Sequence, residues 1–391
     1  MAIRAQGIEG VCDAWIWGVS TLMKFRLLQV QLYERNNCVL ADEIIRGLPD
    51  DYEVTNAFLC GAPRIQDRDR EGVKTVCFGF PESWFKGLRL RVLWRLYRFC
   101  RQEGFDLVVA HRYKPMSLFL QLNRWLKFKR LVGIQHGIGD LDRGHRKREV
   151  RRLLQKNCYV VAVSRAVREY LLNAGAGLDE NNCIQIDNAI DIAAAERMQL
   201  DREEARRQLQ LPADGFLFGT IGRLVPVKGH IHLLDAFAQL KDEFPQASVA
   251  IIGEGQCREE LEAAIARLGL EGRVFLLGAK PQALRYVRAF DVFVMPSLSE
   301  GLPLALLEGM SGHLPVIGSN IPSLLPILED CGGGVFSSGQ PDELAQRLRE
   351  ILLLPRQQLR EQGERCYRYL CSAHSIEDYH RNYRELLALP E

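Results

Sequence analysis

Short apolar runs alternate with amphipathic segments along nearly the whole chain. Runs rich in Val, Ile, Leu and Phe have the length of buried strands, and apolar residues three and four positions apart predict helices. The predicted helices include residues 39–47, 88–103, 165–173 and 201–211. The predicted strands are residues 26–32, 52–58, 74–78, 106–110, 130–135 and 159–163 in the first half and 216–221, 248–252, 274–277, 291–295 and 315–318 in the second.

Regular alternation of strands and helices predicts parallel sheets with helices on both faces. A chain of 391 residues is long for one hydrophobic core and suits two domains of ordinary size. We therefore predict the α/β class, with two Rossmann-like, doubly wound domains that face a cleft. Ligands of such sheets bind beyond the carboxyl ends of the strands, so candidate functional residues are expected there.

The composition is that of a globular protein, with 47% hydrophobic and 26% charged residues. The 11 cysteines form no C-x-x-C pair and no metal-like cluster, which is typical of reduced thiols in a cytosolic protein. No apolar run of about 18 residues predicts a membrane span. Glu9 and Asp13 interrupt the first apolar stretch, so residues 1–22 are predicted to be an extension outside the fold and not a signal peptide.

Charge is unevenly distributed, although the net charge is only +2. Between Lys86 and Arg152 there are 18 Lys or Arg residues and five Asp or Glu residues. A solvated face is one explanation of this basic stretch. A membrane surface or an anionic glycolipid is another, because Arg and Lys clusters bind lipid headgroups and sugar phosphates. Nucleic acid is not an expected partner, since no recognition motif accompanies the charges.

Two glutamates follow the predicted strand 291–295. Glu300 and residues 301–303 are predicted to open a helix, and Glu308 lies about two turns further along, near the same face. Free backbone N–H groups at the start of a helix favour a phosphate. A carboxylate further along that face can accept hydrogen bonds from a ribose diol. Phosphate and diol together indicate a nucleotide.

A basic loop follows the predicted strand 216–221. It holds Arg223 and Lys228 between Gly222 and Gly229. Two cations on a glycine-bounded loop can clamp a diphosphate, although two solvated cations would have the same sequence. Fixed cations beside a departing diphosphate would stabilise the transition state more than the ground state, without a metal.

Five ordered motifs over residues 216–318 resemble the donor half of GT-B glycosyltransferases, and more narrowly their large retaining family 4. The motifs are Gly222-Arg-Leu with Lys228-Gly, Ile252-Gly-Glu-Gly255, Val274-Phe-Leu-Leu-Gly278, Asp291-Val-Phe-Val-Met-Pro-Ser297, and Glu300 with Glu308. The resemblance implies transfer of a hexose from a nucleotide sugar, expected to be UDP-linked. It also implies that the departing phosphate itself accepts the proton of the acceptor.

Site residues follow from this resemblance. Arg223, Lys228 and Glu300 are expected to act on the departing diphosphate and the donor sugar. His136 matches a histidine that touches the donor sugar in related enzymes, and it is expected to share that catalytic role. Glu308 is expected to bind the ribose. The other expected donor-binding residues are Gly222, Gly253, Gly255, Gly278, Gly301, Leu302 and Pro303.

The acceptor side is expected in the first domain. His111, Asp140 and Arg146 are candidates there, and a structural role for His111 is an equal alternative. Asp140-Leu-Asp142 also matches the Asp-x-Asp string of metal-dependent glycosyltransferases of another fold. We interpret this as a chance match, because the string lies in a basic loop.

The resemblance further implies a C-terminal helix that crosses back onto the first domain. The expected domains are residues 23–195 for the acceptor, 196–370 for the donor and 371–391 for the crossover helix. An apolar stripe at helical spacing supports the crossover and consists of Ile376, Tyr379, Tyr383, Leu386 and Leu387. One departure lies after the first strand, where residues 33–38 replace the Gly-Gly pair of many relatives.

The sequence therefore predicts a retaining glycosyltransferase of the EC 2.4 class that needs no cofactor. Its expected acceptor is an anionic glycolipid or oligosaccharide of the cell envelope, in particular lipopolysaccharide core. Its expected location is cytoplasmic, peripheral to the inner membrane. Two alternatives remain open: a nucleotide-sugar epimerase or hydrolase on the same fold, and an inactive nucleotide-sugar-binding subunit. Isomerisation of a UDP-sugar without acceptor would favour the first alternative.

Overall fold

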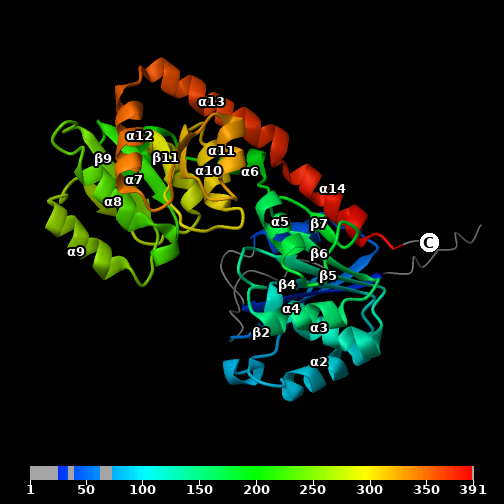
Figure 1. The fold of residues 1–391 in the computed structure, drawn as a ribbon. Coiled ribbons are helices and arrows are strands. Elements are labelled where there is room, and N and C mark those ends of the chain that lie inside the picture. The colour runs from blue at the N-terminus through cyan, green and yellow to red at the C-terminus, as the bar shows by residue number, and fades with distance from the viewer. Residues whose placement is uncertain (1–24, 34–38, 62–72, 390–391) are drawn as a thin grey trace, which may run out of the picture.

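The computed structural model describes residues 25–33, 39–61 and 73–389. The predicted extension 1–22 and residues 34–38 of the loop after the first strand lie outside the described residues. Two parallel sheets, each covered by helices, form two lobes (Figure 1). The predicted α/β architecture with two Rossmann-like domains is confirmed.

The first sheet has the strand order β3-β2-β1-β4-β5-β6-β7, and all neighbouring pairs are parallel. Its strands are β1 (Phe25–Tyr33), β2 (Tyr52–Cys60), β3 (Val73–Cys77), β4 (Leu107–His111), β5 (Arg130–Gln135), β6 (Cys158–Ala162) and β7 (Cys183–Gln185). The helices of this lobe are α1 (Val39–Arg46), η1 (Glu82–Phe85), α2 (Leu90–Glu103), α3 (Tyr113–Leu126), α4 (Gly144–Leu153) and α5 (Arg165–Asn173).

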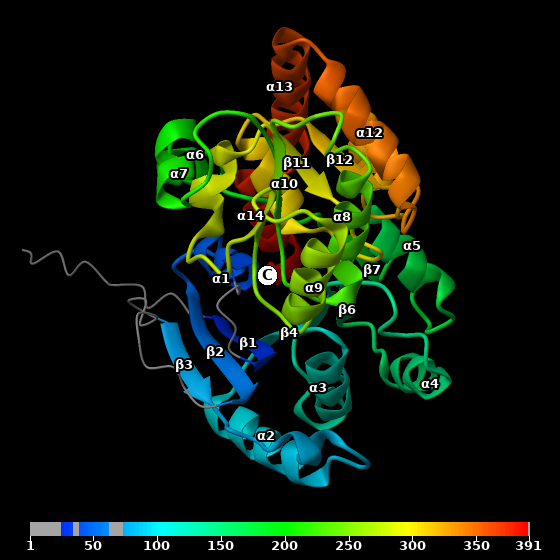
Figure 2. The same cartoon turned by 90° about the vertical axis from the view of Figure 1, so that its left-hand side faces the viewer.

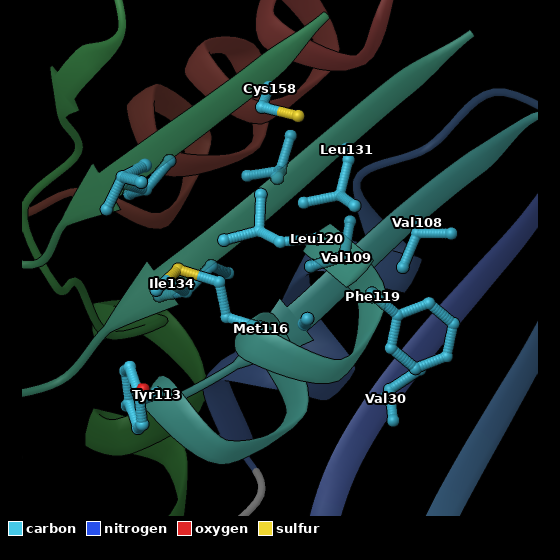
Figure 3. Packing of buried hydrophobic residues seen from close by; sticks show 14 of the residues in the cluster. Val30, Val108, Val109, Tyr113, Met116, Phe119, Leu120, Leu131, Ile134 and Cys158 are labelled. Atoms are coloured by element: carbon cyan, nitrogen blue, oxygen red, sulfur yellow. The ribbon is translucent and has the colours of Figure 1, made fainter. Parts of the chain in front are cut away.

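The core of the first lobe lies between this sheet and its helices. Val108 and Val109 are successive residues of β4 and point to opposite faces, yet both are fully buried because helices cover both faces. On one face, Met116 and Phe119 of α3 pack over the strands (Figure 3). Because both faces of the sheet are buried, successive residues of each strand are apolar. The strands therefore appear as continuous apolar runs and were predictable from the sequence.

The second sheet has the order β10-β9-β8-β11-β12-β13 and is also parallel throughout. Its strands are β8 (Phe216–Ile221), β9 (Ala247–Ile252), β10 (Val274–Leu276), β11 (Val292–Met295), β12 (Val316–Ser319) and β13 (Gly334–Phe336). Its helices are α6 (Ile192–Met198), α7 (Arg202–Gln208), η2 (Pro226–Lys228), α8 (His230–Ala238), α9 (Arg258–Leu268), η3 (Ala283–Ala289), α10 (Leu304–Ser311), α11 (Leu325–Cys331), α12 (Pro341–Leu353) and α13 (Arg356–Ala373).

The chain passes between the lobes twice, and the two passages lie side by side. Ile190 donates its backbone N–H to the His374 carbonyl and forms a parallel bridge with Ser375. His374 Nδ1 lies 2.9 Å from the Asn188 carbonyl. The connection between the lobes is therefore a pair of chain segments joined by hydrogen bonds and one isolated bridge.

The last helix, α14 (Ile376–Leu387), crosses back onto the first lobe, as predicted (Figures 1 and 2). Its anchors to α1 include a 3.2 Å hydrogen bond from the Tyr379 hydroxyl to the Leu40 carbonyl. Burying one such side chain contributes roughly 1.5–3 kcal/mol to the stability of the folded protein. The apolar stripe of α14 is therefore expected to pack against a surface and not to remain in water. The buried stripe consists of Ile376, Tyr379, Tyr383 and Leu387.

Candidate active site

The candidate donor site lies where the strand order of the second sheet changes direction. β8 lies between β9 and β11, so the loops after β8 and β11 leave the sheet side by side. Arg223 and Lys228 follow β8, whereas Ser297 and Glu300 follow β11. A crevice between such diverging loops is the general ligand site of open α/β sheets.

Lys228 and Glu300 form a direct ion pair across this point. Lys228 Nζ lies 2.5 Å from Glu300 Oε1, and both side chains are mostly buried. The Ser297 hydroxyl donates a 2.7 Å hydrogen bond to the same carboxylate oxygen. Within the described residues the ammonium is thus held by one carboxylate, which leaves its other two N–H donors available for a phosphate.

Glu308 approaches the same lysine from α10. Burial raises the pKa of the Glu308 carboxyl to about 7, and the nearby charge of Lys228 opposes that rise. A carboxyl group in this state changes ionisation near neutral pH, so hydrogen-bond donors from a ligand would favour its charged form.

The helix after β11 begins later than the sequence predicts. It starts at Leu304, and Pro303 is its extended N-cap residue, so residues 300–302 lie in a loop before it. Glu300 therefore does not share a helix face with Glu308, and the prediction that residues 300–303 open the helix was wrong. Glu300 instead pairs directly with Lys228, whose charge also lowers the pKa of Glu308 against the effect of burial.

The loop before α10 is fixed by the first lobe. The Ser164 hydroxyl donates to the Gly301 carbonyl at 2.9 Å, and the Asn188 amide donates to the Leu302 carbonyl at 2.8 Å. A Cβ on Gly301 would lie 2.1 Å from the His136 carbonyl oxygen, so only glycine fits. Tertiary contacts, and not local helix propensity, hold these residues outside the helix.

Arg223 differs from Lys228 in its surroundings. Its side chain is exposed, and it forms no ion pair within the described part of the chain. Gly222 lies at the start of the same loop, where its N–H donates to the Ile252 carbonyl at 3.0 Å. The structure thus offers one anchored cation and one exposed cation on the predicted phosphate loop.

The predicted donor-binding glycines bring three loops together. A Cβ on Gly253 would lie 1.8 Å from the Gly222 carbonyl oxygen, and one on Gly255 would lie 2.2 Å from the Leu224 carbonyl oxygen. Gly253 also donates its N–H to the Gly278 carbonyl at 2.9 Å. Close packing of the backbones alone therefore requires glycine at positions 253 and 255, whether or not a ligand binds there.

His111 and His136 meet at the carboxyl ends of β4 and β5. His111 Nδ1 lies 3.1 Å from His136 Nε2, and the rings are nearly parallel. Burial lowers the pKa of His136 to about 3, with a further contribution from the charge of Arg112. Burial also holds the pKa of His111 well below its usual value. Both imidazoles are therefore neutral at pH 7.

The other predicted acceptor residues are engaged with each other. Arg146 donates to the Asp140 carbonyl at 2.8 Å, and its guanidinium carbon lies 4.6 Å from the ring centroid of Tyr113. Asp142 accepts a 2.7 Å hydrogen bond from the Tyr170 hydroxyl. Asp140 and Asp142 thus have separate partners, in agreement with a chance match to the Asp-x-Asp string.

An exposed apolar and basic surface covers α2, on the side of the first lobe that faces away from the second (Figures 1 and 2). Leu88, Leu90 and Trp94 are 79%, 66% and 57% exposed. The Arg98 guanidinium lies over the Trp94 ring at 4.9 Å. Among the described residues, no helix has both the length and the apolar character needed to span a bilayer.

Two family models match this chain. The one described as Glycosyl transferases group 1 matches residues 201–367, and the one described as Glycosyltransferase Family 4 matches residues 39–194. The chain belongs to the group 1, family 4 glycosyltransferases. The matches cover one lobe each, so the family assignment rests on both halves of the GT-B fold.

Individual relatives are more distant. A UDP-Gal:alpha-D-GlcNAc-diphosphoundecaprenol alpha-1,3-galactosyltransferase of Escherichia coli is 28% identical over 246 residues, which cover 59% of this chain and 62% of that protein. The lipopolysaccharide core biosynthesis glycosyltransferase LpsD of Rhizobium meliloti is 33% identical over 139 residues, or 34% of this chain and 39% of that protein. The chain spans between 30% and 63% of the length of five curated relatives that it matches.

A solved structure resembles this fold over nearly its whole length. Anabaena Alr3699/HepE in complex with UDP has a TM-score of 0.78 at 20% identity, covering 93% of this chain and 99% of that chain. At such low identity the likeness shows a shared GT-B fold.

Ser164 and His230 were not singled out in the sequence, and Asn188 stood out only as the start of the turn Asn188-Ala-Ile-Asp191, which resembles a turn of the family. Ser164 was detectable only as the N-cap of α5, where its oxygen accepts from the Val167 N–H. Asn188 belongs to a recognisable turn, but its bond to Leu302 spans 114 residues. His230 is buried beside Gly222 and Lys228, and burial lowers its pKa to about 4. Local sequence carries no signal for such long-range contacts.

Proposed function

We propose that this protein is a retaining glycosyltransferase that transfers a sugar from a UDP-linked donor to a cell-envelope glycan. The observation that carries the proposal is the ion pair of Lys228 with Glu300 at the strand-order change of the second sheet, where the charge of Lys228 also reaches Glu308. A cation for the diphosphate and an acid for the ribose then lie in one site.

In this mechanism the charge that develops on the departing diphosphate is stabilised by Lys228 and Arg223. Glu300, which accepts a hydrogen bond from the Ser297 hydroxyl, holds the ammonium of Lys228 in place before the donor binds, so little reorganisation accompanies the reaction. Glu308 accepts hydrogen bonds from the ribose diol.

The departing phosphate itself accepts the proton of the acceptor hydroxyl on the same face of the sugar. His136 is a poor alternative as general base, because a group with a pKa of about 3 has little affinity for a proton at pH 7. A neutral imidazole can still hydrogen-bond to the donor sugar. With the departing phosphate as the base and His136 only as a hydrogen-bonding group, the acceptor attacks from the face that the diphosphate leaves, which supports retention of configuration.

The proposed donor nucleotide is UDP, and the proposed pathway is synthesis of lipopolysaccharide core. Two relatives support this choice by their names, one as a galactosyltransferase that uses UDP-Gal and one as a lipopolysaccharide core enzyme. The proposed acceptor is an anionic glycolipid or oligosaccharide whose phosphates would pair with the basic first lobe.

We place the enzyme at the cytoplasmic face of the inner membrane, bound peripherally through α2. The exposed Leu88, Leu90 and Trp94 beside arginines support this placement, because apolar side chains enter the headgroup region and arginines pair with anionic lipids. The nine cysteines within the described residues are all free thiols, which suits a reducing compartment.

The test is release of UDP from UDP-sugars with phosphorylated core oligosaccharide as acceptor, followed by NMR of the anomeric linkage. We expect acceptor-dependent release and a product with the configuration of the donor. Lys228→Ala should lower turnover by roughly two to three orders of magnitude, by analogy with the loss of one fixed transition-state donor. Lys241→Ala, a lysine of the same lobe that donates to the Leu268 carbonyl, is the matched control.

Three results would argue against the proposal. Isomerisation or hydrolysis of the UDP-sugar without acceptor would favour an epimerase or a hydrolase. Nucleotide binding without turnover on any acceptor would favour an inactive subunit. Inverted configuration in the product would exclude retention while leaving the transferase assignment intact.

A further inference from the structure

The pairing of His111 with His136 places a second histidine behind the one assigned to the donor sugar. His111 is the last residue of β4 and is 6% exposed, whereas His136 follows the neighbouring strand β5 and is partly exposed. Their 3.1 Å contact joins His111 Nδ1 to His136 Nε2. His136 is thus the outer member of the pair, and His111 reaches the site only through it.

Only one proton can lie between these two nitrogens, so the contact has two possible arrangements. Either His111 Nδ1–H donates to His136 Nε2, or His136 Nε2–H donates to His111 Nδ1. A neutral imidazole carries one N–H, so each arrangement also decides which nitrogen is protonated at the far side of each ring.

The surroundings of the far nitrogen of His111 distinguish the two arrangements. His111 Nε2 is fully buried and has no hydrogen-bond partner among the described residues. The second arrangement would place a proton there and leave a buried N–H donor without an acceptor. Orphaned buried N–H groups are rarer in proteins than buried acceptors that lack a donor. The first arrangement is therefore favoured.

The pair is also kept neutral by its environment. Burial lowers the pKa of both rings, and the charge of Arg112, at the start of α3, disfavours a further proton on either. Each ring thus carries one proton in the neutral state, only one of these protons lies between the rings, and no imidazolium forms near pH 7.

We propose that His111 is a positioning residue, whose Nδ1–H donates to His136 Nε2 and fixes His136 as the Nδ1–H tautomer. His136 then presents its Nδ1–H as a donor to the ligand. Within the described residues this nitrogen forms no hydrogen bond. A hydroxyl oxygen of the bound sugar is the class of acceptor that this donor fits. The ligand assignment rests on the proposed function, whereas the tautomer assignment does not.

The decisive measurement is the tautomer of His136, read by proton–nitrogen correlation NMR on the full-length protein with nitrogen-labelled histidine. Variants at His111 and His136 assign the two rings. We expect His136 to carry its proton on Nδ1 in the wild type. In His111→Leu the ring loses its donor partner, and we expect the Nε2–H tautomer, which free imidazole side chains prefer, to become the major form.

A second variant separates positioning from packing. The amide of an asparagine lies near the place of a histidine Nδ1, so His111→Asn keeps a donor for His136, whereas His111→Leu fills the space without one. We expect His111→Leu to lower kcat about 10- to 100-fold, as loss of an orienting partner does elsewhere, with UDP affinity unchanged. We expect His111→Asn to restore the His136 tautomer and most of kcat.

Two results would overturn the assignment. One is a His136 proton on Nε2 in the wild type, and the other is an unchanged His136 tautomer in His111→Leu. The NMR measurement needs no substrate, so a protein without transferase activity would still support or overturn the tautomer assignment. Failure of the proposed function would appear separately, as the absence of acceptor-dependent UDP release by the wild type.

Discussion

At the residue scale, the charge of Lys228 acts on two carboxyl groups of different character. Glu300 binds the ammonium directly, whereas Glu308 is partly buried on α10 with a pKa of about 7. In the proposed complex a ribose diol donates hydrogen bonds to Glu308, which favours its ionised form. Binding of the nucleotide is then coupled to loss of a proton, so affinity must depend on pH.

We expect UDP affinity to rise roughly tenfold between pH 6 and pH 8, because a carboxyl with a pKa of about 7 passes from mostly protonated to mostly ionised over that range. Calorimetric titration of UDP at both pH values measures this. The terminal phosphate of UDP also ionises near pH 6. Glu308→Gln removes only the protein's contribution and is the matched control. An identical pH dependence in the wild type and in Glu308→Gln would contradict the ribose assignment.

At the scale of elements, the loop before α10 joins the donor site to the first lobe. Its carbonyls at Gly301 and Leu302 are bound by Ser164 and Asn188, and its backbone touches that of His136. One short loop therefore sets the distance between the phosphate cation of one lobe and the histidine pair of the other. A small displacement of the loop should separate the two halves of the site.

Gly301→Ala tests this role. The added Cβ would lie 2.1 Å from the His136 carbonyl oxygen, so the lobes must move apart there. Because misplacement by about 1 Å can cost a hundredfold in rate, we expect turnover to fall by about that factor while UDP affinity changes little. Steady-state kinetics and UDP titration measure the two quantities. Gly144→Ala, whose Cβ would meet nothing within 4 Å, controls for the substitution itself. Wild-type turnover in Gly301→Ala would show that the contact has no catalytic role.

At the scale of the whole molecule, the two lobes carry different parts of the candidate site. The second lobe holds Arg223, Lys228 and Glu308, the residues proposed to bind the nucleotide, and the first lobe holds the histidine pair and the basic helices. The surface of α2 lies on the side of the first lobe away from the second (Figure 2). A membrane bound there would leave the second lobe free to exchange nucleotides.

Co-sedimentation with anionic phospholipid vesicles tests this arrangement. The triple variant Leu88→Ser, Leu90→Ser, Trp94→Ser should lose roughly tenfold or more in vesicle affinity, because burial of one such side chain contributes about 1.5–3 kcal/mol. Salt should weaken wild-type binding by screening the arginines. Leu353→Ser on α12, at a leucine that is 67% exposed in the other lobe, is the matched control. Equal affinity of the triple variant and this control would exclude α2 as the membrane surface.

The sequence by itself determined the fold class, the strands other than the short edge strands β7 and β13, and the residues that carry the family motifs. Parallel strands are buried on both faces, so their apolar runs are visible without any tertiary information. Arg223, Lys228, Glu300 and Glu308 were found for a similar reason, since each follows a strand whose end is predictable. The crossover helix was predictable because its apolar stripe requires a surface to cover.

The tertiary structure alone decided how those residues meet. Lys228 and Glu300 are 72 positions apart and join only because β8 and β11 are neighbours. The start of α10 moved to Leu304 because the other lobe binds the carbonyls before it, which outweighs local helix propensity. The pairing of His111 with His136 depends on the adjacency of β4 and β5. Contacts between distant segments are set by strand order and lobe packing, and neither is encoded in any local pattern.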